Sequence, residues 1–283
     1  MSTRKKEYPE DTSSIDAASQ HYSTGTKHRP LAGMQFDCAQ QESQDSLVFV
    51  LVHGAWHGGW CWKQVAALLR AQGHTVYTPT LTGLGERSHL LSADITLDTF
   101  IDDVANLIRW EQLCNVVLVG HSFAGLVISG VADALPKQLR QLIYLDAFIL
   151  PNGLSTFDTL PAPTVEKMRQ LASQYNVPAV PAPPAHALGL SAESDIEFVA
   201  GRLTPQPLSV YESALNLQNS HIGNHLPCTY ISCTTPAFKG VDASRQWAAE
   251  QKNWDTQELA CGHMAMISAP EALSKLLIEL SSD

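Results

Sequence analysis

The sequence predicts an α/β fold with a doubly wound, mostly parallel sheet at its centre. Two observations support this prediction. Short apolar runs alternate along the 283 residues with segments whose apolar side chains recur at helical spacing, which is typical of parallel strands joined by crossover helices. Several of these runs also lack polar alternation and end at glycine, as strands buried on both faces do.

The alternation begins after a polar leader. Residues 1–45 are rich in Ser, Thr, Pro and charged residues without a lasting period, and we interpret them as a flexible N-terminal extension. The domain itself is expected over residues 46–283. Its strands are expected in the short apolar runs, at residues 47–52, 76–79, 116–119, 142–145, 229–233 and 256–259.

Helical spacing fills the intervals between the runs. The clearest predicted helix covers residues 97–110, where apolar side chains recur every three or four positions. Other helices are expected near residues 65–72, from the glycine-rich corner at 125 to about 134, near 243–251, and over 270–280.

The alternation breaks between residues 148 and 226. This stretch is rich in proline and holds short amphipathic pieces at 165–175 and 193–202, but no buried strand is expected in it. It is too long for an ordinary loop of a compact domain. We therefore predict a helical lid, inserted after the strand that ends near Asp146 and covering the carboxyl ends of the strands.

Composition narrows the partners and the compartment. The net charge of −10 disfavours nucleic acid and anionic membranes as partners. The sequence shows no transmembrane run, secretion signal or transit peptide. Its six cysteines are scattered without metal-binding spacing, as expected for thiols of a reducing compartment. We expect a cytoplasmic protein, and a homodimer is an assembly that the sequence leaves open.

The stretch from Asn115 to Gly125, NVVLVGHSFAG, points to chemistry. A serine between small residues, at the corner between a buried strand and a helix, is typical of a nucleophile elbow. Small side chains at Gly120 and Ala124 are needed because the turn is tight. Ser122 is therefore the candidate nucleophile, and the alternative is an ordinary strand followed by a serine-capped helix.

A serine hydroxyl needs a base, and His263 is the candidate. It follows the last predicted strand in ACGHMAM, and histidine comes last in the triad order of this architecture. Other histidines are weaker candidates: His53 is expected to be structural, His121 should point away from the serine, and His221 and His225 could touch substrate from the lid.

The oxyanion that forms during acyl transfer needs two N–H donors. Phe123, directly after the serine, supplies the first. The glycine-rich loop HGAWHGGW supplies the second, most simply from Ala55. The alternative is a phosphate-binding turn, but the loop lacks the spacing of the known phosphate motifs.

The sequence offers two candidates for the acid that orients the histidine. Asp146 stands immediately at the end of a predicted strand, in LIYLDAFILP, whereas Asp242 lies several residues beyond the next one. A carboxylate at a strand end needs a partner when it is buried, and an imidazole would supply it. We favour Asp146 by its position, with a structural hydrogen bond to the lid as its alternative role.

Apolar side chains gather near the same strand ends. Trp56, Phe148 and Met264 are candidates to line a substrate pocket. As a group they favour a hydrophobic or aromatic substrate, although each one alone could equally be part of the core.

Taken together, several motifs resemble the α/β-hydrolase superfamily: LVHGAWHGGWCW, TPTLTGLGERSH, VGHSFAG, YLDAFILP, RLTPQPL, YISCT and CGHMAM. They look most like bacterial esterase-type hydrolases related to the plant methylesterase and hydroxynitrile lyase group. The resemblance covers about residues 47–280. It implies a cofactor-free hydrolase with no metal, in which Ser122 is the nucleophile and His263 the base.

The chain departs from the plant pattern at two places. The plant relatives carry their aspartate near the position of Pro236, whereas haloalkane dehalogenases, similar in fold, carry their acid after the strand that matches 142–145, as Asp146 would. Hydroxynitrile lyases have threonine and lysine where Ala55 and Met264 stand, which disfavours cyanohydrin cleavage.

We therefore expect a serine-dependent hydrolase that forms an acyl-enzyme with a small to medium carboxylic ester. The alternatives are a lactone, thioester or amide hydrolase, and a lyase or cofactor-free oxygenase on the same fold. From another class, a ligand-binding receptor with residual hydrolase activity is the remaining alternative.

Overall fold

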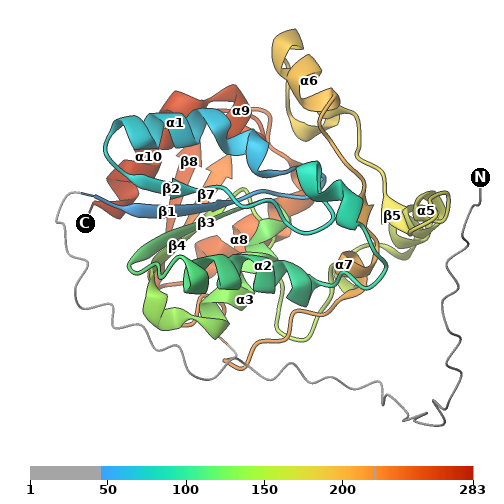
Figure 1. Ribbon diagram of the computed structural model, residues 1–283, viewed down its shortest axis with the longest axis horizontal. Coiled ribbons are helices and arrows are strands. Elements are labelled where there is room, and N and C mark those ends of the chain that lie inside the picture. Colours follow the sequence, from blue (N-terminus) through green and yellow to red (C-terminus); the bar gives the residue numbers. More distant parts are fainter. Residues whose placement is uncertain (1–45, 220, 283) are drawn as a thin grey trace, which may run out of the picture. The chain divides into compact units, whose positions relative to one another are not determined.

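The computed structural model describes residues 46–219 and 221–282, so the predicted extension at 1–45 lies outside the described residues. A six-stranded parallel sheet forms the centre, in the order β2-β1-β3-β4-β7-β8 (Figure 1). Its strands are β1 (Val48–Val52), β2 (Thr75–Tyr77), β3 (Val116–His121), β4 (Leu139–Leu145), β7 (Cys228–Cys233) and β8 (Trp254–Leu259). The predicted doubly wound parallel sheet is confirmed.

The strand order reverses between β1 and β3. The chain leaves β1 towards β2 at one edge, then returns to β3 and continues in the opposite direction. Such a reversal opens a crevice at the carboxyl ends of the two central strands, where parallel sheets bind their ligands. The register pairs Val52 with Gly120, so the loops that follow β1 and β3 start side by side at this crevice.

Helices cover both faces of the sheet (Figure 1). One face carries α1 (Lys63–Ala71), α9 (Ala265–Ser268) and α10 (Pro270–Ser281), and the other carries α2 (Leu97–Trp110), α3 (Ala124–Ala134) and α8 (Asp242–Glu250). The helix predicted over 97–110 is confirmed at both ends. Short 3-10 turns lie at Gly59–Trp62, Gly85–Leu90, Pro136–Gln138, Ala185–Leu188 and Lys239–Val241.

The core has two apolar layers because side chains alternate across each strand. In β1, Phe49 and Leu51 enter the layer under α1 and α10, while Val50 and Val52 enter the layer under α2 and α3. All four are fully buried. Burial of a side chain of this size stabilises the fold by about 1.5–3 kcal/mol, so the two layers fix the strand ends rigidly.

Residues 148–226, named the insert below, connect β4 to β7. The insert holds α4 (Thr156–Thr159), α5 (Ala162–Ala172), β5 (Ala179–Val180), α6 (Glu193–Ala200), β6 (Gln206–Pro207) and α7 (Ser209–Glu212). The helical pieces predicted at 165–175 and 193–202 correspond to α5 and α6, and α6 projects away from the sheet (Figure 1).

The expectation that the insert has no buried strand was wrong. Strands β5 and β6 pair antiparallel through Ala179–Pro207 and Val180–Gln206, and all four residues are buried. A strand of two residues is too short to show the alternation of apolar and polar side chains, and its partner strand lies far along the chain. The sequence therefore carries no signal for this pairing. In the described part of the chain, every helix is too short or too polar to cross a bilayer.

Candidate active site

Ser122 lies at the corner between β3 and α3 in a left-handed backbone conformation, with φ of 53°. This conformation is costly for a residue with a side chain and persists only where its surroundings enforce it. The Ser122 N–H donates to the Leu145 carbonyl at 3.1 Å, and the Ser122 carbonyl accepts from the Phe148 N–H at 2.9 Å. The end of β4 therefore holds the corner from one side.

Small residues around this corner are needed at two positions. A Cβ on Gly120 would lie 2.8 Å from the Ala124 carbonyl oxygen, and a Cβ on Gly125 would lie 2.1 Å from the Phe148 carbonyl oxygen. Ala124 itself carries a side chain and is fully buried. The tightest steric requirement therefore falls on Gly125, one residue beyond the last position of the elbow motif.

Three buried side chains form a hydrogen-bonded series at the carboxyl edge of the sheet. The Ser122 hydroxyl lies 3.0 Å from Nε2 of His263, and Nδ1 of His263 lies 2.7 Å from Oδ2 of Asp146. In the tautomer that satisfies both contacts, the serine donates to Nε2 and Nδ1–H donates to the carboxylate. This is the arrangement in which an imidazole can take a proton from a serine.

Of the two candidate acids, the structure brings Asp146 to the histidine. Asp146 follows β4 directly, has φ of 42° and is fully buried. Its Oδ1 accepts from the Cys233 N–H at 3.2 Å and from Nη2 of Arg245 at 2.9 Å. These donors offset the cost of burying a carboxylate. Asp242 is 58% exposed and pairs with Arg245 at 2.6 Å.

The loop after β1 approaches the serine closely. A Cβ on Gly54 would lie 2.8 Å from the Ser122 Cβ, so glycine lets the two backbones meet. His53 holds the loop, because its Nε2 accepts from the Leu81 N–H at 3.0 Å and its Nδ1 donates to the Gly54 carbonyl at 2.8 Å. This is the structural role expected for His53.

The two N–H groups predicted to form an oxyanion hole are those of Ala55 and Phe123. Within residues 46–219 and 221–282, neither N–H donates a hydrogen bond to the protein. Both residues are buried, at 6% and 2% exposure. A buried N–H without a partner is rare in proteins, and two such donors beside the serine could serve a ligand oxygen.

The insert fixes the residue that follows Ala55. Trp56 has φ of 66°, and its N–H donates to Oε1 of Gln206 at 3.2 Å. Its indole Nε1 donates to the Val180 carbonyl at 3.1 Å, and its carbonyl accepts from the Thr204 N–H at 2.9 Å. The β5–β6 pair thus holds the loop after β1, which carries the Ala55 N–H. Gln206 lies in the RLTPQPL motif, but the sequence does not predict this role for its side chain.

Three further buried histidines surround the site. Burial lowers the pKa of His53 to about 4 and that of His57 to about 3, and it holds the pKa of His121 well below its usual value. All three are therefore neutral near pH 7. Nε2 of His121 donates to the His263 carbonyl at 2.9 Å, so His121 points away from the serine and supports the backbone of the histidine.

The predicted pocket residues lie in different surroundings. Phe148 and Trp56 are partly buried and contact the apolar layer under α2 and α3. Met264 is fully buried in the opposite layer. Two aromatic side chains that the sequence did not single out also contact residues of the site. Phe238 stacks on His263 at 4.2 Å between centroids, and Tyr211 of the insert contacts Phe123 at 5.3 Å.

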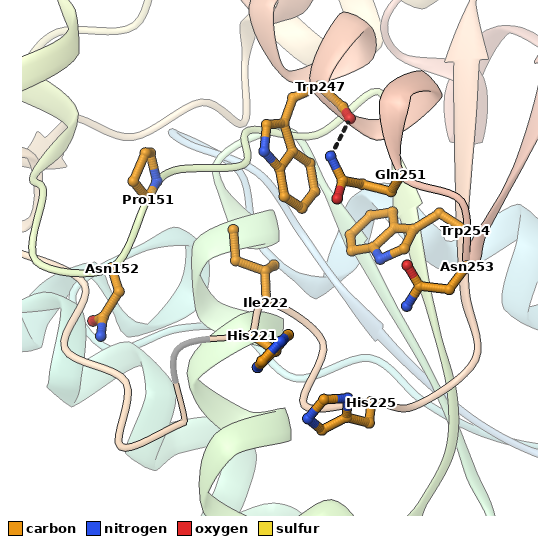
Figure 2. A pocket seen from close by; sticks show the side chains of 9 residues that line it. All are labelled: Pro151, Asn152, His221, Ile222, His225, Trp247, Gln251, Asn253 and Trp254. Carbon is orange, nitrogen blue, oxygen red and sulfur yellow. Dashed lines mark hydrogen bonds between the residues drawn. The ribbon is translucent and has the colours of Figure 1, made fainter.

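His221 and His225, considered above as substrate contacts, line a different hollow. Figure 2 shows them with Trp247 and Trp254 around a cavity of about 280 Å³. The two imidazole rings lie 4.4 Å apart. Trp254 begins β8, and His263 follows the other end of the same strand, so this hollow lies towards the amino end of β8, away from the serine.

A buried serine, histidine and aspartate at the carboxyl ends of the strands of a parallel sheet, with the serine at a strand-to-helix corner, define the class of α/β hydrolases. The chain belongs to the alpha/beta hydrolase family, whose model matches residues 49–276.

Named relatives fall within the same family. The chain is 38% identical over 247 residues to a carbendazim hydrolyzing esterase from Nocardioides sp. (strain SG-4G), covering 82% of this chain and 98% of that protein. It is 26% identical to a putative chloroplastic methylesterase 11 from Arabidopsis thaliana, where the match spans 82% of this chain but only 63% of the relative.

Solved structures share the fold. An extracellular α/β-hydrolase from a Paenibacillus species superposes with a TM-score of 0.72 at 24% identity, covering 82% of this chain and 98% of that one. Tomato methylketone synthase I superposes with a TM-score of 0.70 at 23% identity, covering 83% and 98%.

Proposed function

We propose that this protein is a carboxylic-ester hydrolase that uses Ser122 as its nucleophile. The observation that carries the proposal is the hydrogen-bonded series of Ser122, His263 and Asp146, with 3.0 Å and 2.7 Å between the bonded atoms. The family membership and the esterase names of its relatives support the reaction class.

In the proposed reaction, His263 takes the proton of Ser122 as Oγ attacks the ester carbonyl carbon. The carbonyl oxygen becomes an oxyanion, held by the N–H groups of Ala55 and Phe123. His263 then gives the proton to the departing alcohol, leaving an acyl-serine. Water, deprotonated by the same histidine, releases the acid. Asp146 holds the imidazole tautomer and faces the positive charge that forms on it.

The insert is proposed to act as a lid that selects the substrate. Gln206 and Val180 bond the residue beside the oxyanion donor, and Tyr211 and Phe157 stack at 5.8 Å next to Phe123. Because these groups are largely apolar, a small to medium hydrophobic or aromatic ester is the proposed substrate. The predicted pocket roles of Trp56, Phe148 and Met264 belong to the same proposal.

The test is hydrolysis of a chromogenic short-chain aryl ester by wild type and Ser122→Ala. Loss of about 10³-fold or more in kcat, with the same circular dichroism spectrum, is expected because no other nucleophile replaces the serine. Ser274→Ala is the matched control, since this buried serine bonds the Pro270 carbonyl of α10. Unchanged turnover in Ser122→Ala contradicts the proposal.

The reaction type can be separated from a lyase, an oxygenase or a slow binding protein on the same fold. When the reaction is quenched in the steady state, mass spectrometry should detect the acyl group of the substrate on the peptide that contains Ser122. An ester that is consumed without this adduct contradicts an acyl-enzyme, and tight binding without hydrolysis favours a receptor.

We also propose a cytoplasmic location. Four of the five described cysteines, Cys61, Cys228, Cys233 and Cys261, are buried free thiols, as in a reducing compartment, whereas Cys114 is disulfide-bonded. Fractionation of cells that express the full chain tests this, and recovery outside the cytoplasm contradicts it.

A further inference from the structure

The buried carboxylate of Asp146 is shared between two nitrogen donors of different kinds, an imidazole and a guanidinium. Its Oδ2 faces His263 at 2.7 Å, and its Oδ1 faces Nη2 of Arg245 at 2.9 Å. In a serine–histidine–acid series the acid stabilises the imidazolium that forms during turnover. Here a permanent positive charge already neutralises part of the carboxylate before any proton moves.

We infer that Arg245 is a positioning residue for Asp146, one that fixes the carboxylate and weakens its hold on the imidazolium of His263. The inference rests on the proposed function for its meaning in catalysis, but its effect on His263 is measurable without substrate.

Arg245 is itself held from two sides. It lies in the first turn of α8, with Nη1 at 2.6 Å from Asp242 and Nη2 at 2.9 Å from Asp146. The planar guanidinium can span two carboxylates in this way, whereas a lysine ammonium presents a single point of charge. Its side chain is 24% exposed, while Asp146 is fully buried. The ion pair with Asp146 is therefore only weakly screened by water.

The position of the acid explains why such a partner is needed. Asp146 has a left-handed φ of 42° directly at the end of β4, and its carboxylate is surrounded by strand ends. The Cys233 N–H, at 3.2 Å, is its only backbone donor in the described part of the chain. A buried carboxylate with an imidazole and one amide would still lack donors, and Arg245 completes the set.

Other titratable groups face the pair, and they determine which part of a pH profile is informative. They are His57 after β1, His121 of β3, Tyr230 and Cys233 of β7, Cys261 after β8, and Asp242 of α8. Burial lowers the pKa of His57 to about 3 and holds that of His121 well below its usual value, so both imidazoles are neutral near pH 7. The hydrogen bond with Cys233 lowers the pKa of Cys261. Because this thiol can titrate on the alkaline side of the pH profile as well, only the acidic limb is used.

The expected sign follows from charge. Removal of a positive charge beside Asp146 favours protonation of the His263–Asp146 pair, so the acidic limb of kcat/KM should move to higher pH. For Arg245→Gln, which keeps an N–H donor without the charge, we expect a shift of about 0.5–1 pH unit. Arg245→Lys keeps the charge and should restore a limb close to that of wild type. A purely structural role would lower activity at every pH without moving the limb.

The experiment measures kcat/KM for a chromogenic ester from pH 4.5 to 8, and in parallel the pH midpoint of the His263 imidazole signal by NMR. The matched control is Arg109→Gln, which removes the same charge from α2, where Arg109 bonds Asn106. The inference is overturned if Arg245→Gln leaves both the acidic limb of kcat/KM and the NMR midpoint of His263 at their wild-type pH values.

If Arg245→Gln does not fold, Asp242→Asn carries the test, because Asp242 is 58% exposed and its loss leaves the pair with Asp146. It should move the NMR midpoint of His263 slightly to lower pH, and a shift to higher pH or no shift overturns the inference. If the variants move the NMR midpoint of His263 as expected but wild type shows no ester hydrolysis that depends on Ser122, the proposed function alone is refuted.

Discussion

His263 and Asp146 lie 117 positions apart in the chain, yet Nδ1 of the imidazole is 2.7 Å from Oδ2 of the carboxylate. The acid comes from the end of β4 rather than from the loop after β7, and the histidine follows β8. Strand β7 lies between them in the sheet, and its Cys233 N–H bonds the same carboxylate. Strand β7, after which the plant relatives have their aspartate, therefore holds Asp146 through a backbone hydrogen bond in this protein.

The first prediction separates the two acids. Asp146→Asn should lower kcat by about 10²–10⁴-fold, because an amide cannot stabilise the imidazolium and can select the wrong tautomer. Asp242→Asn should stay within about threefold of wild type at pH 7.5, since its exposed carboxylate pairs, among the described residues, with Arg245 alone. Steady-state kinetics of both variants on one ester measures this difference. A loss of activity confined to Asp242→Asn would assign the role of the acid to Asp242 instead of Asp146.

The second prediction concerns the hold of the insert on the oxyanion loop. Gln206→Leu removes the acceptor for the Trp56 N–H and frees the residue next to Ala55. We expect kcat to fall about tenfold with little change in KM, since the Ala55 donor acts on the oxyanion more than on the bound ester.

Gln141→Leu is the control for Gln206→Leu. Gln141 is also buried and bonds Oγ of Ser281 at 2.7 Å, far from the insert. It should cost stability without lowering kcat. Equal kcat values for the two variants would show that the Gln206 contact does not support the loop.

The third prediction tests the steric requirement behind the elbow. Gly125→Ala places a Cβ 2.1 Å from the Phe148 carbonyl oxygen, and the strain should lower the free energy of unfolding by about 1–3 kcal/mol. Activity should fall as well, because the Phe148 N–H bonds the Ser122 carbonyl.

Gly201→Ala is the matched change for Gly125→Ala, since a Cβ there meets nothing within 4 Å. It should leave stability unchanged or raise it by a few tenths of a kcal/mol, up to about 1 kcal/mol. Urea unfolding measures both variants. A Gly125→Ala protein as stable as Gly201→Ala would mean that the corner can relax.

The fourth prediction is a loss of stability in acid. Burial lowers the pKa of His53 from 6.5 to about 4, so between these pH values the unfolded chain binds a proton at His53 and the folded chain does not. The stability that the neutral His53 contributes is fully present above about pH 6.5 and is lost as pH falls towards 4. The contribution at stake is on the order of 3 kcal/mol.

His53→Gln keeps an acceptor for the Leu81 N–H but cannot titrate in this range. Between pH 7 and pH 5, its free energy of unfolding should therefore fall less than that of wild type. Parallel urea titrations at the two pH values give the comparison, and equal losses would mean that His53 is protonated in the folded protein.

The sequence predicts this fold well because apolar runs and helical spacing are local signals. The helix over 97–110 was predicted at both ends, and the order of strands and helices followed from their alternation. Ser122 and His263 were chosen for the same reason, since each stands in a short motif at a strand end. The structure brings these two side chains together with Asp146.

What the sequence did not indicate depends on contacts between distant segments. Arg245 reaches Asp146 only because α8 packs against β7 and β8, next to β4 in the sheet. Gln206 reaches Trp56 only because the insert returns over the loop after β1. Arg245 stands in no motif, and RLTPQPL, which contains Gln206, does not by itself indicate the contact with Trp56. Phe238, which stacks on His263, reads as an ordinary loop phenylalanine.

The insert also touches the histidine loop, through backbone alone. A Cβ on Gly262 would lie 2.1 Å from the Gly189 carbonyl oxygen, and a Cβ on Gly189 would lie 2.8 Å from the His263 nitrogen. No side chain at this contact can change rotamer to absorb a misfit. An insert transplanted from a relative into this scaffold would therefore need glycine at both positions, since any larger residue would displace His263 before a substrate is bound.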